Sequence, residues 1–172
     1  MEARDHYTRY QYDKLFELAV EVFRRYGFSD EDSNKIADVI LTSDRLGIES
    51  HGVNRLTLYP FGLDIGRIKK DVTMEVVEDS MCCAVIDAHD GMGQLAGIMG
   101  MELAIKKAKQ YGIGMVSVRN SNHFGIAGYY SRLAAKEGMM GISMTNAEAL
   151  VVPTFAKEPM FGTNPIAITI PA

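Results

Sequence analysis

The stretch from residue 82 to residue 118, "CCAVIDAHDGMGQLAGIMGMELAIKKAKQYGIGMVSV", decides the fold of the chain. Its two ends are short apolar runs bounded by turn residues, and such runs predict strands. The middle, residues 93–112, is long enough for a helix and finishes on Gly112, a typical helix stop. Strand, helix and strand in succession predict an α/β layer in which part of the strand pairing is parallel.

The alternation of strand and helix continues on both sides of this stretch. Residues 73–79 predict one more strand before it, joined to it by a polar turn. Residues 125–138 predict a helix that stops at a glycine. Residues 139–146 predict a buried strand, and residues 166–170 predict a last strand. The chain from 73 to 172 is therefore expected to form a mixed-sheet α/β domain.

The first part of the chain is predicted to be mainly helical. Apolar residues recur at helical spacing from residue 12 to residue 26, and a glycine follows. Residues 29–47 predict a second helix, with an N-cap serine and acidic residues in its first turn. Residues 51–68 predict a third helical piece that is broken near Pro60. We place the boundary of this helical segment, residues 1–72, just before Thr73.

The bulk properties exclude several classes of protein. A chain of 172 residues can form one domain with a sizeable core, or two small ones. Its net charge of −4 argues against a large nucleic-acid-binding surface. No apolar run approaches the length of a membrane span, and the charged N-terminus lacks the apolar segment of a signal peptide. We therefore expect a cytoplasmic protein without a nucleic-acid or membrane partner.

The segment "GMGQLA", residues 91–96, superficially fits a dinucleotide-binding fingerprint. Gly91 and Gly93 follow a predicted strand and precede a predicted helix, as that motif requires. A Rossmann unit also needs an acidic residue at the end of the next strand, about 20 residues further on, to hold the ribose. Here that strand ends in "VSVRNSN", without Asp or Glu. We therefore attribute the glycines to turn chemistry and expect a sheet of non-Rossmann type.

His51 lies in "ESHGVNRLTLYP" and is a candidate for the functional site. If this segment is helical, His51, Arg55 and Tyr59 share one face because they are four residues apart. An imidazole, a forked guanidinium and a phenol together suit a small carboxylate with a neighbouring oxygen. The alternative, which periodicity alone favours, is an ordinary polar helix face.

His123 is the second candidate, in "RNSNHFGIAGYYSR". It follows a predicted strand and precedes a predicted helix, and ligands usually bind at the carboxyl edge of such strands. Asn122 can orient the imidazole or meet a substrate, and Gly125 lets backbone or ligand approach closely. From these residues alone, an acid/base histidine and a hydrogen-bonded loop histidine are equally good interpretations.

Other kinds of site find little support in the sequence. No nucleophile elbow, hydrolase triad or phosphate-binding "GxxxxGK[ST]" motif occurs, and the scattered histidines lack metal-ligand spacing. No metal is therefore expected. His6 and His89 are predicted to be surface residues, and the adjacent Cys82 and Cys83 to be small strand residues.

Three motifs in order resemble one known family. The segments "SHGVNRL", "SNHFGIAGYYSRLAAKEGMMGISMTNA" and "FGTNPIAITIP" together are similar to the malate/L-lactate (L-sulfolactate) dehydrogenases. These are oxidoreductases of 2-oxoacids that depend on NAD or NADP and lack a Rossmann fold, and ureidoglycolate dehydrogenase, diketogulonate reductase and cyclic imino-acid reductases are related to them. The resemblance covers essentially the whole chain.

The resemblance implies specific roles for residues of these motifs. It implies that His123 donates and accepts the proton, and that His51 is a second catalytic candidate at the substrate site. It also implies NAD or NADP as cofactor, a small carboxylate as substrate and a homodimer as the assembly. The implied substrate-site residues are Ser50, Arg55, Tyr59 and Asn122, and the implied cofactor-side residues are Thr145, Asn146, Gly162, Thr163 and Asn164.

These roles agree with the chemistry of the side chains. Reduction of a 2-oxoacid needs a proton for the nascent alkoxide, and a histidine with a pKa near 6.5 can supply it near neutral pH. An arginine can hold the carboxylate in a bidentate grip that fixes which face of the carbonyl meets the hydride.

The length of the chain keeps two further hypotheses open. Members of the family are longer, so we expect this chain to correspond to their N-terminal part and its α/β domain to be incomplete. It could therefore be a remnant or assembly partner that binds no nicotinamide. Its substrate could also be a cyclic imino acid or ureidoglycolate, because each presents a carboxylate beside the reacting carbon.

Overall fold

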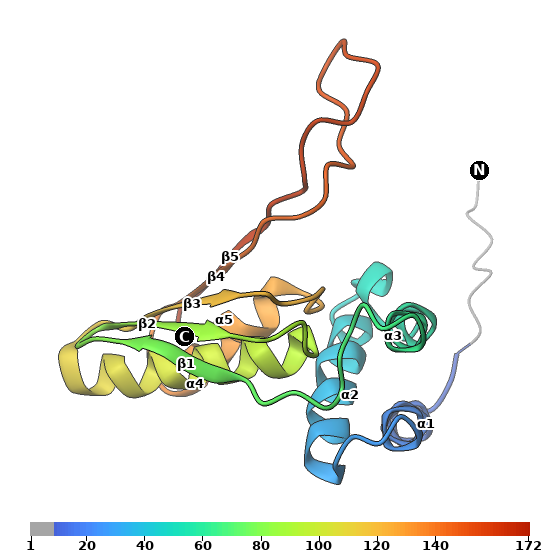
Figure 1. The fold of residues 1–172 in the computed structure, drawn as a ribbon, viewed down its shortest axis with the longest axis horizontal. Coiled ribbons are helices and arrows are strands. Elements are labelled where there is room, and N and C mark those ends of the chain that lie inside the picture. Colours follow the sequence, from blue (N-terminus) through green and yellow to red (C-terminus); the bar gives the residue numbers. More distant parts are fainter. Residues whose placement is uncertain (1–8) are drawn as a thin grey trace.

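The computed structural model describes residues 9–172, and Figure 1 shows its helical part beside a layer of strands and helices. The helical part consists of α1 (Tyr12–Arg25), α2 (Asp30–Arg45), the 3-10 turn η1 (Glu49–His51) and α3 (Arg55–Asp64). Ser29 caps α2 by accepting a hydrogen bond from the Asp32 amide, as its sequence predicts. The prediction for His6 lies outside the described residues.

Two expectations for the segment that leads into α3 are wrong. The expected break near Pro60 is absent, since α3 runs through this residue. The backbone just before it turns with i→i−3 hydrogen bonds, from Arg55 N to Gly52 O and from Leu56 N to Val53 O, so the regular ladder that a proline interrupts is only beginning. In addition, residues 51–59 are not one helix, because the backbone at Gly52, with φ −88° and ψ −144°, is not helical and separates η1 from α3.

The predicted strand–helix–strand unit is confirmed. Strand β2 (Cys83–Asp87) pairs in parallel with β3 (Met115–Arg119), from Cys83 opposite Met115 to Asp87 opposite Arg119. Helix α4 (Gly93–Tyr111) connects the two strands and ends at Gly112, whose φ of 83° is the left-handed conformation that glycine adopts without strain. Strand β1 (Glu75–Asp79) adds to the other edge of β2 in antiparallel orientation, so this sheet is mixed.

The last part of the chain forms a separate two-stranded sheet with a long arm. Helix α5 (Ala127–Lys136) leads into β4 (Gly141–Met144), which pairs antiparallel with β5 (Ile166–Thr169). The segment between these strands extends far from the body of the molecule (Figure 1). The expectation of a buried strand at 139–146 is wrong, because α5 covers only one face of β4 and leaves Ile142 and Met144 exposed.

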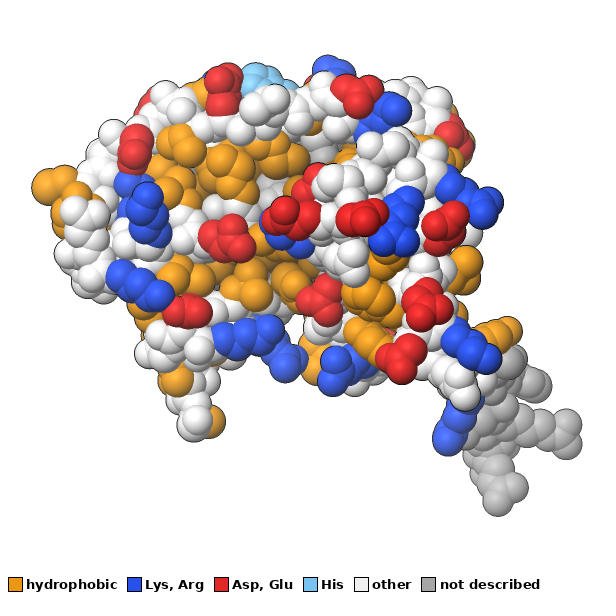
Figure 2. Space-filling view, turned by 90° about the horizontal axis from the view of Figure 1, so that it is seen from below, with side chains coloured by type: hydrophobic (Ala, Val, Ile, Leu, Met, Phe, Trp, Pro, Cys, Tyr) orange, Lys and Arg blue, Asp and Glu red, His pale blue; other side chains and the backbone are white. Residues whose placement is uncertain are grey.

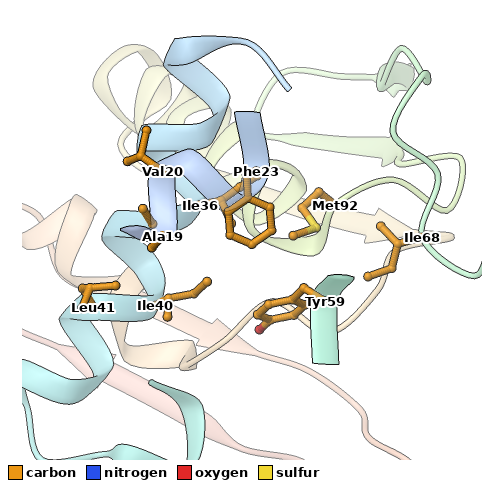
Figure 3. Packing of buried hydrophobic residues seen from close by; sticks show 10 residues of the cluster. Ala19, Val20, Phe23, Ile36, Ile40, Leu41, Tyr59, Ile68 and Met92 are labelled. Atoms are coloured by element: carbon orange, nitrogen blue, oxygen red, sulfur yellow. The ribbon is translucent and has the colours of Figure 1, made fainter. Parts of the chain in front are cut away.

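The hydrophobic core crosses the predicted boundary at Thr73. Figure 3 shows Tyr59 of α3 and Ile68 facing Met92, which immediately precedes α4, within the cluster that α1 and α2 complete. A second cluster joins Val39 of α2 to Tyr130 of α5. Helix α2 therefore packs against both the helical part and the strand-containing part of the chain. The division into domains 1–72 and 73–172 stays a prediction.

On the surface, apolar patches lie open between charged side chains (Figure 2). The exposed apolar residues include Met115, Leu150, Phe155, Met160 and Phe161.

A buried lysine ties the β1–β2 turn to α4. The Lys107 side chain is 8% exposed, and its ammonium contacts the Asp79 carboxylate and donates to the Ser80 carbonyl at 2.6 Å. We expect Lys107→Met to lower the free energy of unfolding by about 1–3 kcal/mol, because the carbonyl loses a charged donor. Urea denaturation checks this, with Lys106→Met at an exposed position of the same helix as control. Equal stability of the two variants would contradict the anchoring role.

Candidate active site

The loop that carries His123 is held at both of its ends. Asn120 follows β3 with a φ of 50°, and its side-chain amide donates to the buried carboxylate of Asp87 at 3.0 Å. The Asn122 side chain donates to the backbone carbonyls of Asp90 and Gly91 at 2.7 and 3.1 Å. The loop is therefore bound to the carboxyl end of β2, where ligands of α/β proteins usually bind.

The glycine pattern of residues 91–96 serves packing. A Cβ on Gly93 would lie 2.3 Å from the Asn122 carbonyl oxygen and 2.5 Å from that of His123. The start of α4 can therefore approach the histidine loop only because this position has no side chain. A Cβ on Gly91 would meet the Ala88 carbonyl at 2.9 Å and the Val72 side chain at 2.8 Å.

Asp44 of α2 fixes the corner that carries His51. Its carboxylate accepts a hydrogen bond of 2.7 Å from the Val53 amide, and burial raises its pKa. A Cβ on Gly52 would lie 1.8 Å from an oxygen of this carboxylate, so the corner closes only around glycine. The chain after η1 is thereby turned so that the His51 imidazole meets the loop of His123.

The two histidines lie against each other. Their ring centroids are 5.2 Å apart and the ring planes make an angle of 25°, which is a stacked arrangement. The Ser50 hydroxyl and His51 Nδ1 are 2.8 Å apart, within hydrogen-bond distance. Arg55 Nε donates to the Ser50 carbonyl at 2.6 Å, which holds the guanidinium beside the histidine pair.

Tyr59 reaches His123 from the hydrophobic core. Its side chain is fully buried, and its hydroxyl lies 2.8 Å from His123 Nδ1. The Gly125 amide, which can only donate, points to the same nitrogen at 3.3 Å. From these bonds we assign Nδ1 as an acceptor in the neutral ring, so that Nε2 carries the proton.

Positive charge surrounds the histidine pair. Burial, together with Arg55, His51 and Arg67, lowers the pKa of His123 to about 4. Burial and Arg55 also lower the pKa of His51, whereas burial raises that of the Tyr59 hydroxyl. The His123 side chain nevertheless keeps an exposed surface through which a ligand can reach it. The pair is therefore neutral in the free protein near pH 7.

The structure brings four of the predicted side chains together, but not along the helix face that their spacing suggested. Ser50, His51, Arg55 and Tyr59 do meet, but around a corner and not along one helix face. Arg67 was missed because its approach to His123 depends on the turn after α3, for which the sequence offers no motif.

The surface next to Arg55 has an open depression of about 620 Å³. It is lined by Ser50, Asn54, Arg55, Thr57, Leu58 and Phe61.

The predicted cofactor-side residues lie together at the base of the arm. The Thr145 amide donates to the Pro165 carbonyl at 3.3 Å, and the Asn164 side chain accepts from the Ala147 amide at 2.9 Å. Among residues 9–172, no hydrogen bond joins these segments to His123 or His51. The segment around residues 145–147 and the segment around residues 162–165 are thus neighbours of each other. The predicted cofactor-side residues in these two segments are Thr145, Asn146, Gly162, Thr163 and Asn164.

The part of the chain that the structure describes lacks two other kinds of feature. Within residues 9–172, no group of three or more His, Cys, Asp or Glu side chains could hold a metal ion. No helix in the same range is long and apolar enough to cross a membrane.

Comparisons with known proteins show which proteins this chain is similar to. Malate dehydrogenase from Pyrococcus horikoshii is 47% identical over 167 residues, which are 97% of this chain and 46% of that protein. L-sulfolactate dehydrogenase from Methanocaldococcus jannaschii is 46% identical over 151 residues, 88% of this chain and 44% of that protein. The solved structure of the P. horikoshii malate dehydrogenase matches with a TM-score of 0.94 at 46% identity, over 99% of this chain and 49% of that one.

The chain spans about half the length of the curated relatives that it matches. The fold class is confirmed, since the helical part and the mixed sheet superpose on a malate dehydrogenase. A family model described as malate/L-lactate dehydrogenase matches residues 10–172. The chain therefore belongs to the malate/L-lactate dehydrogenase family of oxidoreductases.

Proposed function

We propose that this chain carries the substrate-binding and proton-transfer groups of a dehydrogenase that interconverts a small 2-oxoacid and its 2-hydroxyacid. The observation that carries the proposal is the arrangement around His123. Its Nδ1 is occupied by Tyr59 and Gly125, which leaves Nε2 as the nitrogen that faces a ligand, and Arg55 stands beside it. An acid/base next to a carboxylate anchor is what this reaction requires.

Arg55 is the anchor for the substrate carboxylate. Its Nε is bound to the Ser50 carbonyl, and its terminal amino groups form no hydrogen bond to the described residues, so they can grip a carboxylate through two oxygens. Arg67 brings a second positive charge to the same histidine. Two cations suit a substrate with two negative groups, and the names malate and L-sulfolactate of the relatives at 46–47% identity denote such acids.

His123 exchanges the proton with the substrate oxygen through Nε2. A bound dianion offsets the charges of Arg55 and Arg67, so the imidazole can take up a proton that it lacks in the free protein. The charged ring carries a proton on each nitrogen, and in reduction it gives the one on Nε2 to the substrate oxygen and keeps the one on Nδ1. In oxidation the bare Nε2 of that ring takes the proton from the substrate hydroxyl. His51 stacks on the ring and fixes its plane, while the buried Tyr59 holds Nδ1 from behind.

A nicotinamide cofactor supplies the hydride when it is bound. The segments at the base of the arm offer hydroxyl and carboxamide groups, which are the donors and acceptors that a nicotinamide amide, a ribose and a phosphate use. Asn146 and Thr163 are exposed there and would hold the cofactor. We propose NAD or NADP as the cofactor and a homodimer as the assembly.

Cofactor binding separates an enzyme from a non-catalytic assembly partner. Titration of the chain with NADH and with NADPH, followed by cofactor fluorescence, should show saturable binding of at least one of them. With oxaloacetate present, consumption of the cofactor should follow, and His123→Gln should lower turnover by about 10²–10⁴. His89→Gln is the matched control, since His89 pairs with Glu75 away from this site. Absence of binding favours the assembly partner, and a preference for a cyclic imine favours the imino-acid reductase.

The grip of Arg55 can be tested without the cofactor. Tartronate, an unreactive 2-hydroxy diacid, should bind the chain, and Arg55→Lys should weaken this binding about tenfold or more because a point charge cannot form two parallel hydrogen bonds. Isothermal titration calorimetry measures the affinity. Arg132→Lys, at an exposed position of α5, should bind tartronate like the unchanged chain. Equal affinity in Arg55→Lys would remove Arg55 from the carboxylate site.

The same ligand should change the titration of His123. The pKa of about 4 in the free chain should rise when tartronate binds, because the ligand offsets the neighbouring cations. Binding then takes up a proton between the free and the bound pKa, so tartronate affinity should increase as pH falls through the bound pKa and level off below about 4. Imidazole NMR signals and calorimetry in buffers of different ionisation enthalpy measure both effects. A pKa unchanged by saturating tartronate would contradict the site.

A further inference from the structure

Cys82 and Cys83 are the two cysteines of the chain, and their sulfurs lie close together. The Sγ atoms are 3.7 Å apart, and both side chains are partly exposed. Neighbouring side chains of an extended strand point to opposite faces, which would separate the sulfurs. Here the backbone bends at Cys82, just before β2 begins at Cys83. The bend brings both thiols to the same side, so the pair is a vicinal dithiol.

The backbone of this dithiol is held in place by its neighbours. The Cys82 carbonyl accepts from the Met115 amide at 2.8 Å, and the Cys83 carbonyl accepts from the Ser80 amide at 2.9 Å. The buried Lys107 holds the preceding turn by donating to the Ser80 carbonyl at 2.6 Å. A ligand that binds both sulfurs therefore finds them already in position, which lowers the entropic cost of binding.

The distance between the sulfurs suits a bridging atom better than a direct bond. A disulfide needs sulfurs about 2.05 Å apart and Cα atoms about 4.4–6.8 Å apart, whereas adjacent residues place their Cα atoms about 3.8 Å apart. Two sulfurs on one central atom lie roughly 3.5 Å apart, for bonds of about 2.3 Å at angles of about 100°. The observed 3.7 Å is close to the second arrangement. Hydrogen bonding with Cys82 also raises the pKa of the Cys83 thiol, which disfavours the thiolate that disulfide exchange requires.

The surroundings of the dithiol limit which central atom it can hold. A structural zinc ion needs four ligands, and within residues 9–172 no group of three or more His, Cys, Asp or Glu side chains could hold a metal. Trivalent arsenic in an organic arsenical needs only two sulfurs, because its carbon substituent is the third partner. Met81 precedes the pair, and Met115 lies opposite Cys83 in the sheet. Both methionines are exposed and offer that substituent an apolar rim.

We propose that Cys82 and Cys83 form a chelating site for trivalent arsenicals, apart from the candidate active site. With phenylarsine oxide, two As–S bonds form, and the two thiol protons leave with the arsenic-bound oxygen as water. Arsenic stays trivalent and neither sulfur is oxidised, so no further reactant is needed. The site lies at the start of β2, whereas the loop of His123 is bound to the other end of this strand through Asp87. Arsenical binding therefore does not depend on the proposed dehydrogenase reaction.

The test is the binding of phenylarsine oxide to the chain, measured by mass spectrometry of the intact protein. We expect one phenylarsenic group per chain, which excess glutathione leaves in place and dithiothreitol removes, because a monothiol competes poorly with a chelate. Cys82→Ser and Cys83→Ser should each weaken binding about 10²-fold or more, since the second bond is lost. The matched control, Cys82→Ser with Thr73→Cys, keeps two thiols in the chain. It places one of them beyond Glu75, at the other end of the sheet, and should bind like Cys82→Ser.

Arsenic X-ray absorption spectroscopy on the unchanged chain decides the question even if a variant fails to fold. It should find two As–S bonds for each bound arsenic. A single As–S bond, an adduct that glutathione removes, or equally tight binding by the control with two distant thiols would overturn the chelating site. Tartronate and cofactor binding test the proposed function separately, since phenylarsine oxide needs neither of them to bind.

Discussion

The hydrogen bond between the Tyr59 hydroxyl and His123 Nδ1 joins two parts of the chain that are 64 residues apart. Tyr59 is fixed by the core that α1 and α2 form, and His123 is fixed by a loop bound to the sheet. The bond sets the rotation of the imidazole and determines which nitrogen meets a ligand. A displacement of either part would therefore disturb the site, even though neither part contains all of it.

The elements of secondary structure could be predicted because their causes are local. Ser29 caps α2 and Gly112 ends α4, and both follow from side-chain chemistry that acts within one helical turn. The break at Pro60 was mispredicted because the tight turn before it is not visible in the sequence. The exposure of β4 was mispredicted for a related reason, since the residues of a strand do not tell what covers its faces.

The sequence indicated which side chains of the candidate site lie near one another, but not the geometry in which they meet. A spacing of four residues suggested that His51, Arg55 and Tyr59 share a helix face, yet the backbone leaves the helical conformation at Gly52. The residues still meet because Asp44, from α2, closes the corner by accepting the Val53 amide. That contact joins residues that no local pattern connects. Arg67 escaped prediction in the same way, because it approaches the histidine pair only through tertiary packing.

The charges around His123 disfavour protonation of its imidazole in the free protein and favour it in the substrate complex that we propose. Burial first, and then the charges of Arg55 and Arg67, keep the imidazole neutral, because a further positive charge in this partly buried, cationic pocket is unfavourable. A substrate with two negative groups reverses this balance, so the proton donor becomes charged only when there is something to receive its proton. A monoanion would offset less of the positive charge and raise the pKa of His123 less. The number of negative groups on the substrate would then affect the proton-transfer step as well as binding, and this coupling would select for dianions even if both kinds of acid reached the pocket.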